Sequence, residues 1–209
     1  MPKYAYLYVL DTMSDWETGY LIAELNTGRY FKKGTEKYNV KTLGITRKSI
    51  TTMGGIQITP DVLVNELTIE NTDLLILPGA DTWFDTIHAP LLTKVKDLIE
   101  ADICVAAICG ATIALANAGL LDNHQHTSND PGYLKSVCPN YRGEHYYKQE
   151  PAVTDGNLIT ASGIAPLEFA CAVLKNLDVF SPQTLDSWYK LYLTKEAACF
   201  FSLMKSLNP

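Results

Sequence analysis

The chain has 209 residues, a formal net charge of −6 and no long run of like charges. This length fits one α/β domain with a small addition better than two independent cores. The charge pattern argues against a nucleic-acid groove or a basic membrane-binding face, no apolar stretch is long enough to span a bilayer, and the first residues lack a signal-peptide pattern. We therefore expect a cytoplasmic protein with no nucleic-acid or membrane partner.

Strand and helix signals alternate along most of the chain. Apolar runs predict strands at 4–10, 40–45, 73–77, 103–108 and 158–161, and two glycines between β-branched residues predict a hairpin at 49–59. Helical periodicity and capping signals predict helices at 14–27, 91–101, 111–118, 131–137 and 166–177. Repeated strand–helix units with continuously apolar strands predict an α/β fold, in which a mainly parallel sheet has helices on both faces.

The last part of the chain repeats apolar residues at helical spacing. We expect a first domain at 1–180 and a C-terminal helical extension at 181–209. The apolar face of this extension must be covered, either by the domain itself or at a dimer interface.

The cysteines give little sign of disulfide or metal chemistry. There are five of them, widely spaced, with no CxxC pair and no Cys/His spacing suited to zinc. We expect free thiols in a reducing compartment, no metal and no cofactor. Cys104 and Cys171 lie among apolar residues and are expected to pack, whereas Cys138 precedes a proline in a loop and could be exposed, with nothing nearby to activate it.

Cys109 stands where a buried strand gives way to a helix. Small residues lie two positions on either side of it, at Ala107 and Ala111, as a sharp nucleophile elbow requires. A thiol at a helix N-terminus is expected to be shifted toward the reactive thiolate. The alternative is an inert, buried cysteine at the end of an apolar strand.

Four motifs together resemble the ThiJ/PfpI superfamily, which is related to class I glutamine amidotransferases. They are DWET at 15–18, ILPGA at 76–80, AAICGA at 106–111 and DGNLITASG at 155–163. The resemblance covers roughly residues 3–177 and implies a flavodoxin-like three-layer sandwich, a nucleophilic cysteine and frequent homodimers. It leaves the reaction open, because one fold hosts many activities.

The resemblance also implies roles for individual residues. Cys109 matches the family nucleophile, and Glu17 matches an acidic partner that we expect to be protonated beside the sulfur. The backbone N–H groups of Gly110 and Ala80 match an oxyanion hole, although a left-handed backbone at Ala80 would be strained where the family usually has glycine. Glu17 has an alternative role as the last member of a capping box that starts at Ser14.

The base of a hydrolytic triad is missing from its usual place. Many family members have a histidine after two hydroxyl residues downstream of the elbow helix, but this chain has Asn129 there. His126 lies three residues earlier, on the opposite face of an extended segment. His126 and Asn129 stay open as base or ligand contact, and His145 is a further alternative from the next loop. Trp83 and Phe84 either wall the pocket or pack in the core.

These residues favour an enzyme in which Cys109 attacks a small carbonyl, amide or related electrophile, of hydrolase, glyoxalase or deglycase type. Its partner would be a small-molecule substrate. The main alternative is a stress-response protein or redox sensor with an oxidisable cysteine. A cysteine peptidase or a glutamine amidotransferase-like subunit is a weaker alternative, since amide hydrolysis requires a group that protonates the leaving amine.

Overall fold

A computed structural model describes residues 2–207 of the chain. Its central sheet has seven strands in the order β5-β2-β1-β6-β7-β9-β8, and a separate two-stranded hairpin pairs β3 with β4. The strands are β1 Lys3–Tyr8, β2 Tyr38–Gly44, β3 Ile50–Thr51, β4 Gln57–Ile58, β5 Val62–Leu63, β6 Leu74–Leu77, β7 Cys104–Ile108, β8 Ala152–Asp155 and β9 Leu158–Ala161. The helices are α1 Gly19–Thr27, α2 Ala89–Glu100, α3 Gly110–Asn117, α4 Pro131–Val137, α5 Pro166–Asn176, α6 Pro182–Thr194 and α7 Ala197–Ser206.

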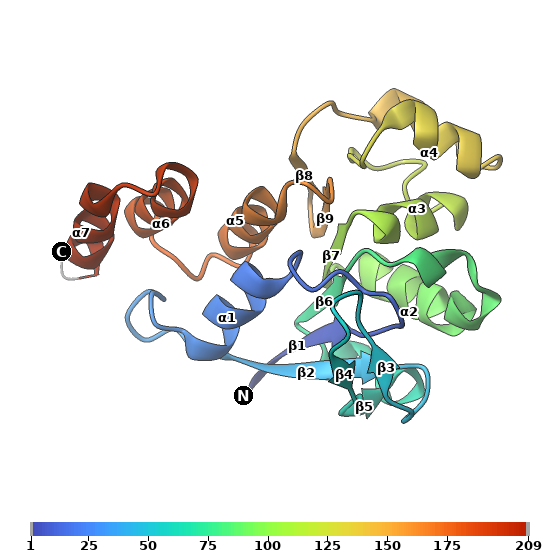
Figure 1. Ribbon diagram of the computed structural model, residues 1–209, viewed down its shortest axis with the longest axis horizontal. Coiled ribbons are helices and arrows are strands. Elements are labelled where there is room, and N and C mark those ends of the chain that lie inside the picture. The colour runs from blue at the N-terminus through green and yellow to red at the C-terminus, as the bar shows by residue number, and fades with distance from the viewer. Residues whose placement is uncertain (1, 208–209) are drawn as a thin grey trace.

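The sheet is parallel except at one edge, where β8 runs antiparallel to β9. Helices α1 and α5 pack against each other on one face, whereas α2 and α3 contact β7 on the other (Figure 1). Every residue of β6, β7 and β9 is buried, because both faces of these strands are covered. The predicted fold, a flavodoxin-like mainly parallel sandwich with C-terminal helices, is confirmed.

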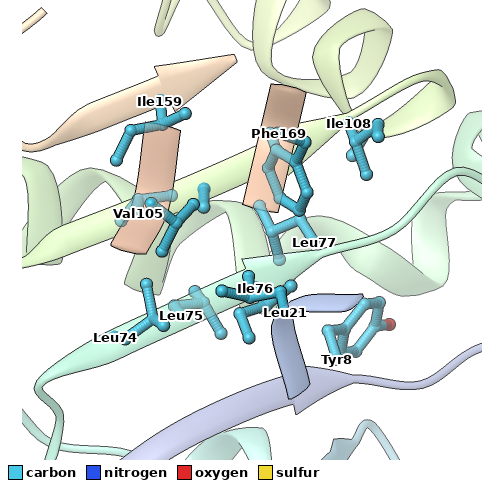
Figure 2. Close-up of a cluster of buried hydrophobic side chains, with 14 of the residues drawn as sticks. Tyr8, Leu21, Leu74, Leu75, Ile76, Leu77, Val105, Ile108, Ile159 and Phe169 are labelled. Carbon is cyan, nitrogen blue, oxygen red and sulfur yellow. The ribbon is translucent and has the colours of Figure 1, made fainter. Parts of the chain in front are cut away.

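The core lies between the sheet and its helices. Figure 2 shows Leu74–Leu77 of β6 and Val105 of β7 close to Leu21 of α1 and Phe169 of α5. All of these side chains are buried. Burial of this kind is the main term that stabilises the sheet against the entropy of the unfolded chain.

The register of the sheet brings four loops to one edge. β1, β6, β7 and β9 are parallel neighbours and end at Tyr8, Leu77, Ile108 and Ala161. Each of the four motifs noted in the sequence includes residues of one of the loops that follow these carboxyl ends. In open α/β sheets this edge is where ligands bind.

The first helix begins later than predicted. α1 starts at Gly19, its N-cap residue Thr18 makes no side-chain capping bond, and Asp15 and Trp16 form a turn ahead of it. The predicted capping box is therefore wrong, because the Ser14 N–H donates to the Gly79 carbonyl and the Glu17 carboxyl accepts from the Gly79 N–H.

The C-terminal helices pack on the remainder of the chain. α6 contacts α5, and the fully buried Trp188 donates its indole N–H to Glu24 of α1 at 3.1 Å. α7 packs on α6, with Ser206 donating to Thr184 at 3.0 Å. The extension thus covers the outer side of α1 and α5. The domain boundary at 180 and a homodimer stay predictions.

Candidate active site

Cys109 occupies a strained position between β7 and α3. Its backbone has φ 59° and ψ −124°, outside the regions that ordinary residues favour. The hydroxyl of Thr112 donates to the Cys109 carbonyl at 2.6 Å, and the Cys109 N–H donates to Ala161 of β9 at 3.0 Å. The elbow predicted from the sequence is therefore held on both sides, and its half-buried thiol lies at the ligand-binding edge of the sheet.

Glu17 comes to the same place from the loop after β1. Its side chain is buried, and its Oε2 accepts a hydrogen bond from the Gly79 N–H at 2.6 Å. Its Oε1 is also buried and has no hydrogen-bond partner within residues 2–207. Burial raises the pKa of the Glu17 carboxyl, partly opposed by the hydrogen bond from Gly79. A neutral carboxyl beside the sulfur is therefore favoured over a charged one.

Asn129 brings a side-chain amide to the sulfur. Its Nδ2 donates to Cys109 Sγ at 3.3 Å, while its Oδ1 accepts from the Gly163 N–H at 2.8 Å and from the Ser162 hydroxyl at 3.3 Å. The two contacts to Oδ1 orient the amide, so that its N–H group points at the thiol.

Gly163 closes the other side of the sulfur. A Cβ on Gly163 would lie 2.6 Å from Cys109 Sγ, and a Cβ on Gly79 would lie 2.7 Å from Cys109 Cβ and 2.8 Å from both Glu17 oxygens. Neither position accepts a side chain without displacing the thiol. Both glycines belong to motifs visible in the sequence, but the sequence does not indicate a role for Gly163. The need for glycine there arises from its contact with Cys109, which exists only in the folded chain.

The backbone expected to form the oxyanion hole is unstrained. Ala80 has φ −161°, which is extended backbone that any residue adopts. The strain that a left-handed backbone would cause at this alanine is therefore absent. A Cβ on Gly110 would lie 2.9 Å from the Ala80 carbonyl oxygen and 3.3 Å from its nitrogen. The backbones of Gly110 and Ala80 thus approach each other closely, and a side chain at 110 would separate them.

A pocket of about 330 Å³ opens above these groups. The residues that line it come from the loops after β1, β6, β7 and β9, from the β3–β4 hairpin and from the loop before α4: Ser14, Trp16, Glu17, Met53, Ala80, Asp81, Cys109, Asn129, Ser162, Gly163 and Ile164. Trp83 does not line it, since its buried indole donates to the Pro78 carbonyl, and Phe84 is exposed elsewhere. The aromatic wall is Trp16, which sequence reasoning did not select.

All four histidines lie away from this pocket. The Nδ1–H of His126 donates to the His124 carbonyl at 2.6 Å, and its Nε2 accepts from the Tyr141 hydroxyl at 2.5 Å. Both ring nitrogens are therefore engaged in hydrogen bonds. Burial also lowers the pKa of His126, which favours the neutral ring. His145 is exposed in a short 3₁₀ turn, and His88 is bound to Tyr8. Of the two residues left open, the structure therefore brings Asn129 to Cys109 and leaves His126 apart.

The thiols differ from expectation in two respects. Burial raises the pKa of the Cys109 thiol and the nearby Glu17 charge raises it further, whereas the hydrogen bond from Asn129 lowers it. The net direction is upward, so the shift toward thiolate expected from the helix N-terminus is not found. Cys138 is buried rather than exposed, and its thiol contacts the Ile113 carbonyl at 3.4 Å.

Within residues 2–207, no cluster of three or more His, Cys, Asp or Glu side chains is arranged to hold a metal ion. The same residues contain no helix that is both long and apolar enough to cross a membrane.

Comparison with known proteins agrees with this geometry. Residues 3–176 match the model of the DJ-1/PfpI family. The chain is 57% identical to an uncharacterized protease of Bacillus subtilis, YoaZ, over 97% of both chains. It superimposes on a ThiJ/PfpI family protein of Bacillus anthracis with a TM-score of 0.97 at 56% identity, over 100% of this chain and 99% of the other. A DJ-1 superfamily protein of Agrobacterium tumefaciens gives a TM-score of 0.81 at 30% identity, over 92% and 98%. The chain belongs to the DJ-1/PfpI family.

Proposed function

We propose that the protein is an enzyme that uses Cys109 as a nucleophile toward small, reactive carbonyl compounds of the α-oxoaldehyde type. The observation that carries this proposal is the set of groups around the sulfur: a buried carboxyl, a side-chain amide and a glycine, with no imidazole. This set supports addition to a carbonyl better than hydrolysis of a peptide, because an amide side chain cannot protonate a leaving amine at neutral pH.

In the first step Cys109 Sγ forms a bond to the aldehyde carbon, and the π pair of the carbonyl moves to its oxygen. As this bond forms, the neutral Glu17 carboxyl donates its proton to the oxygen and takes up the thiol proton, so that thiol and aldehyde become a hemithioacetal without any other reactant. The N–H groups of Gly110 and Ala80 are the proposed donors to the developing oxyanion.

In the second step Glu17 gives its proton to the ketone oxygen and takes the proton from the former aldehyde carbon, which forms an enediol. Glu17 then gives this proton to the former ketone carbon and takes the hydroxyl proton of the sulfur-bearing carbon, which leaves a thioester of a 2-hydroxy acid. Water then cleaves the thioester and restores the free thiol. A carboxyl whose pKa is raised by burial suits this shuttle, since it can both hold and release a proton closer to neutral pH.

The test is consumption of methylglyoxal by the purified protein, followed together with cleavage of an unstructured fluorescent casein. Wild type and Cys199→Ser, which removes a thiol on α7 far from the pocket, are expected to consume methylglyoxal at equal rates. Cys109→Ala is expected to abolish consumption. Equal consumption by Cys109→Ala, or casein cleavage that disappears with Cys109, would overturn the proposal.

A second function has a specific observation in its favour. The unpartnered Glu17 Oε1 lies where it can donate a hydrogen bond to an oxygen on the sulfur. We propose for this case that Cys109 reacts with hydrogen peroxide to give sulfenic acid and water, and that Glu17 stabilises the oxidised sulfur. Mass spectrometry after graded peroxide should then find added oxygen at Cys109 first, and less of it in Glu17→Ala.

A further inference from the structure

Three exposed apolar side chains surround the mouth of the Cys109 pocket. Trp16 comes from the loop after β1, Met53 from the turn between β3 and β4, and Ile164 from the loop after β9. Their side chains are 53%, 48% and 95% exposed. Single exposed apolar residues are ordinary, but three that line one pocket from separate segments give it an apolar surface, which we call the rim.

The backbone at two of these residues, Ile164 and Met53, is held by hydrogen bonds. Around Ile164, the Gly163 N–H donates to Asn129 at 2.8 Å and the Ala165 N–H to Ser162 at 2.9 Å. The Met53 N–H donates to the Met13 carbonyl at 2.9 Å. These bonds fix the backbone that carries Ile164 and Met53 beside the pocket.

The charges at the pocket are of one sign. No Lys, Arg or His side chain lines it, and its charged side chain at the rim is Asp81. Glu17, on the floor, is pushed toward its neutral form by burial. A carboxylate substrate would find no cation to replace its lost hydration and would be repelled by Asp81.

We propose that Trp16, Met53 and Ile164 form a specificity subsite for the apolar substituent of an uncharged carbonyl substrate, such as the phenyl ring of phenylglyoxal. This rests on the proposed function. The aldehyde carbon lies at Cys109 on the pocket floor and the substituent lies against the rim. Anionic aldehydes such as glyoxylate are excluded by the absence of a cation.

The first experiment compares kcat/KM for phenylglyoxal, methylglyoxal and glyoxylate. We expect phenylglyoxal to exceed methylglyoxal by about tenfold, the gain from burying part of one ring against the rim, and glyoxylate to be the poorest of the three. Trp16→Ala and Ile164→Ser should lower the value for phenylglyoxal by about tenfold, and should lower the value for methylglyoxal by a smaller factor because its methyl group has less apolar surface to bury. Phe201→Ser, which removes an exposed aromatic side chain from α7, is the matched control and should change neither value.

A second experiment measures the subsite without turnover. Alkylation of Cys109 by N-benzyl iodoacetamide, iodoacetamide and iodoacetate, in which the sulfur displaces iodide, is timed by intact mass and divided by the rate for free glutathione. We expect the order benzyl amide, amide, acetate, and we expect Trp16→Ala and Ile164→Ser to remove the advantage of the benzyl amide alone.

The two experiments separate the two proposals. The expected alkylation order without any aldehyde consumption would support the subsite and overturn the proposed reaction. Cys109-dependent consumption with equal kcat/KM for phenylglyoxal and methylglyoxal, or rim variants that behave like Phe201→Ser in both experiments, would overturn the subsite.

Discussion

At the scale of single residues, the space around the Cys109 sulfur depends on Gly163, which has no side chain. Gly163→Ala would place a methyl group 2.6 Å from Sγ, so that either the sulfur or the loop after β9 must move. We expect alkylation of Cys109 by iodoacetamide to slow at least about tenfold, with a loss of stability of about 1–3 kcal/mol from overpacking. Gly19→Ala is the control, since a Cβ there meets nothing within 4 Å and lies in the first turn of α1. Unchanged alkylation in Gly163→Ala would show that the loop yields easily.

The protonation of Glu17 has its own signature in stability. Because burial raises its pKa in the folded protein, the wild type binds a proton there more tightly when folded than when unfolded. Stability from this group is fully present below the ordinary glutamate pKa and is lost as pH rises through the raised, folded pKa.

Glu17→Gln keeps a neutral acceptor for the Gly79 N–H and does not titrate. We therefore expect its free energy of unfolding, relative to wild type, to increase with pH over that window and to level off above it. Urea denaturation at a series of pH values measures this difference. A difference that stays constant with pH would mean that Glu17 titrates alike in the folded and unfolded chain.

The position of Cys109 could be predicted from the sequence, whereas the surroundings of its thiol could not. Cys109 at a strand-to-helix turn was visible in the apolar run and its small neighbours. The raised thiol pKa was not, because it depends on burial by loops distant in the chain. The role of Gly163 was hidden for a similar reason, since its contact with residue 109 forms only when β7 and β9 pair.

At the scale of elements, Asp15 attaches the β3–β4 hairpin to the loop after β1. Its carboxylate accepts from the Thr52 hydroxyl and from the Gly54 N–H, each at 2.6 Å. The turn between these two residues carries Met53 to the pocket mouth. The hydrogen bond from Thr52 is the main cause that lowers the pKa of Asp15.

We expect Asp15→Ala to lower hydrogen-exchange protection in residues 50–58 by about fivefold, the effect of about 1 kcal/mol of lost hydrogen bonding at an exposed site. Asp15→Asn, whose amide can accept from Gly54 and donate to Thr52, should retain most of the protection. Because the folded pKa is lowered, wild-type protection should be complete above the ordinary aspartate pKa and decline as pH falls through the lowered one, whereas Asp15→Asn should show no such decline. Equal protection in all three proteins would contradict this role.

The elements themselves were largely predictable. The buried strands of the sheet, the hairpin and helix α4 follow local patterns of apolarity, glycine and capping that the structure reproduces. The start of α1 was not predictable, because Ser14 and Glu17 satisfy the local pattern of a capping box. In the folded chain the Glu17 carboxyl instead accepts a hydrogen bond from Gly79, 62 positions along the chain. A tertiary contact that competes with a local one leaves no trace in a short window of sequence.

At the scale of the whole molecule, the C-terminal helices are part of the core. Trp188 of α6 is fully buried and donates to Glu24, which also forms an ion pair with Arg29. We expect Trp188→Ala to lower the free energy of unfolding by about 3–5 kcal/mol, and Trp188→Phe by less, since it loses the hydrogen bond but keeps most of the packing. Leu193→Ala, exposed near the end of α6, should be within about 0.5 kcal/mol of wild type. Chemical denaturation measures all three, and a small effect of Trp188→Ala would mean that α6 is a dispensable appendage.

The three tryptophans of the chain lie in three different surroundings. Trp16 is half exposed at the pocket mouth, Trp83 of the loop after β6 is buried, and Trp188 of α6 is buried against α1. Their fluorescence is therefore separable: Trp16 should emit at long wavelength and be quenched by iodide, whereas the other two should emit at short wavelength and be protected. The unlabelled protein thus carries one optical reporter for ligand entry and two for the integrity of its interior, and the two events can be timed in a single cuvette.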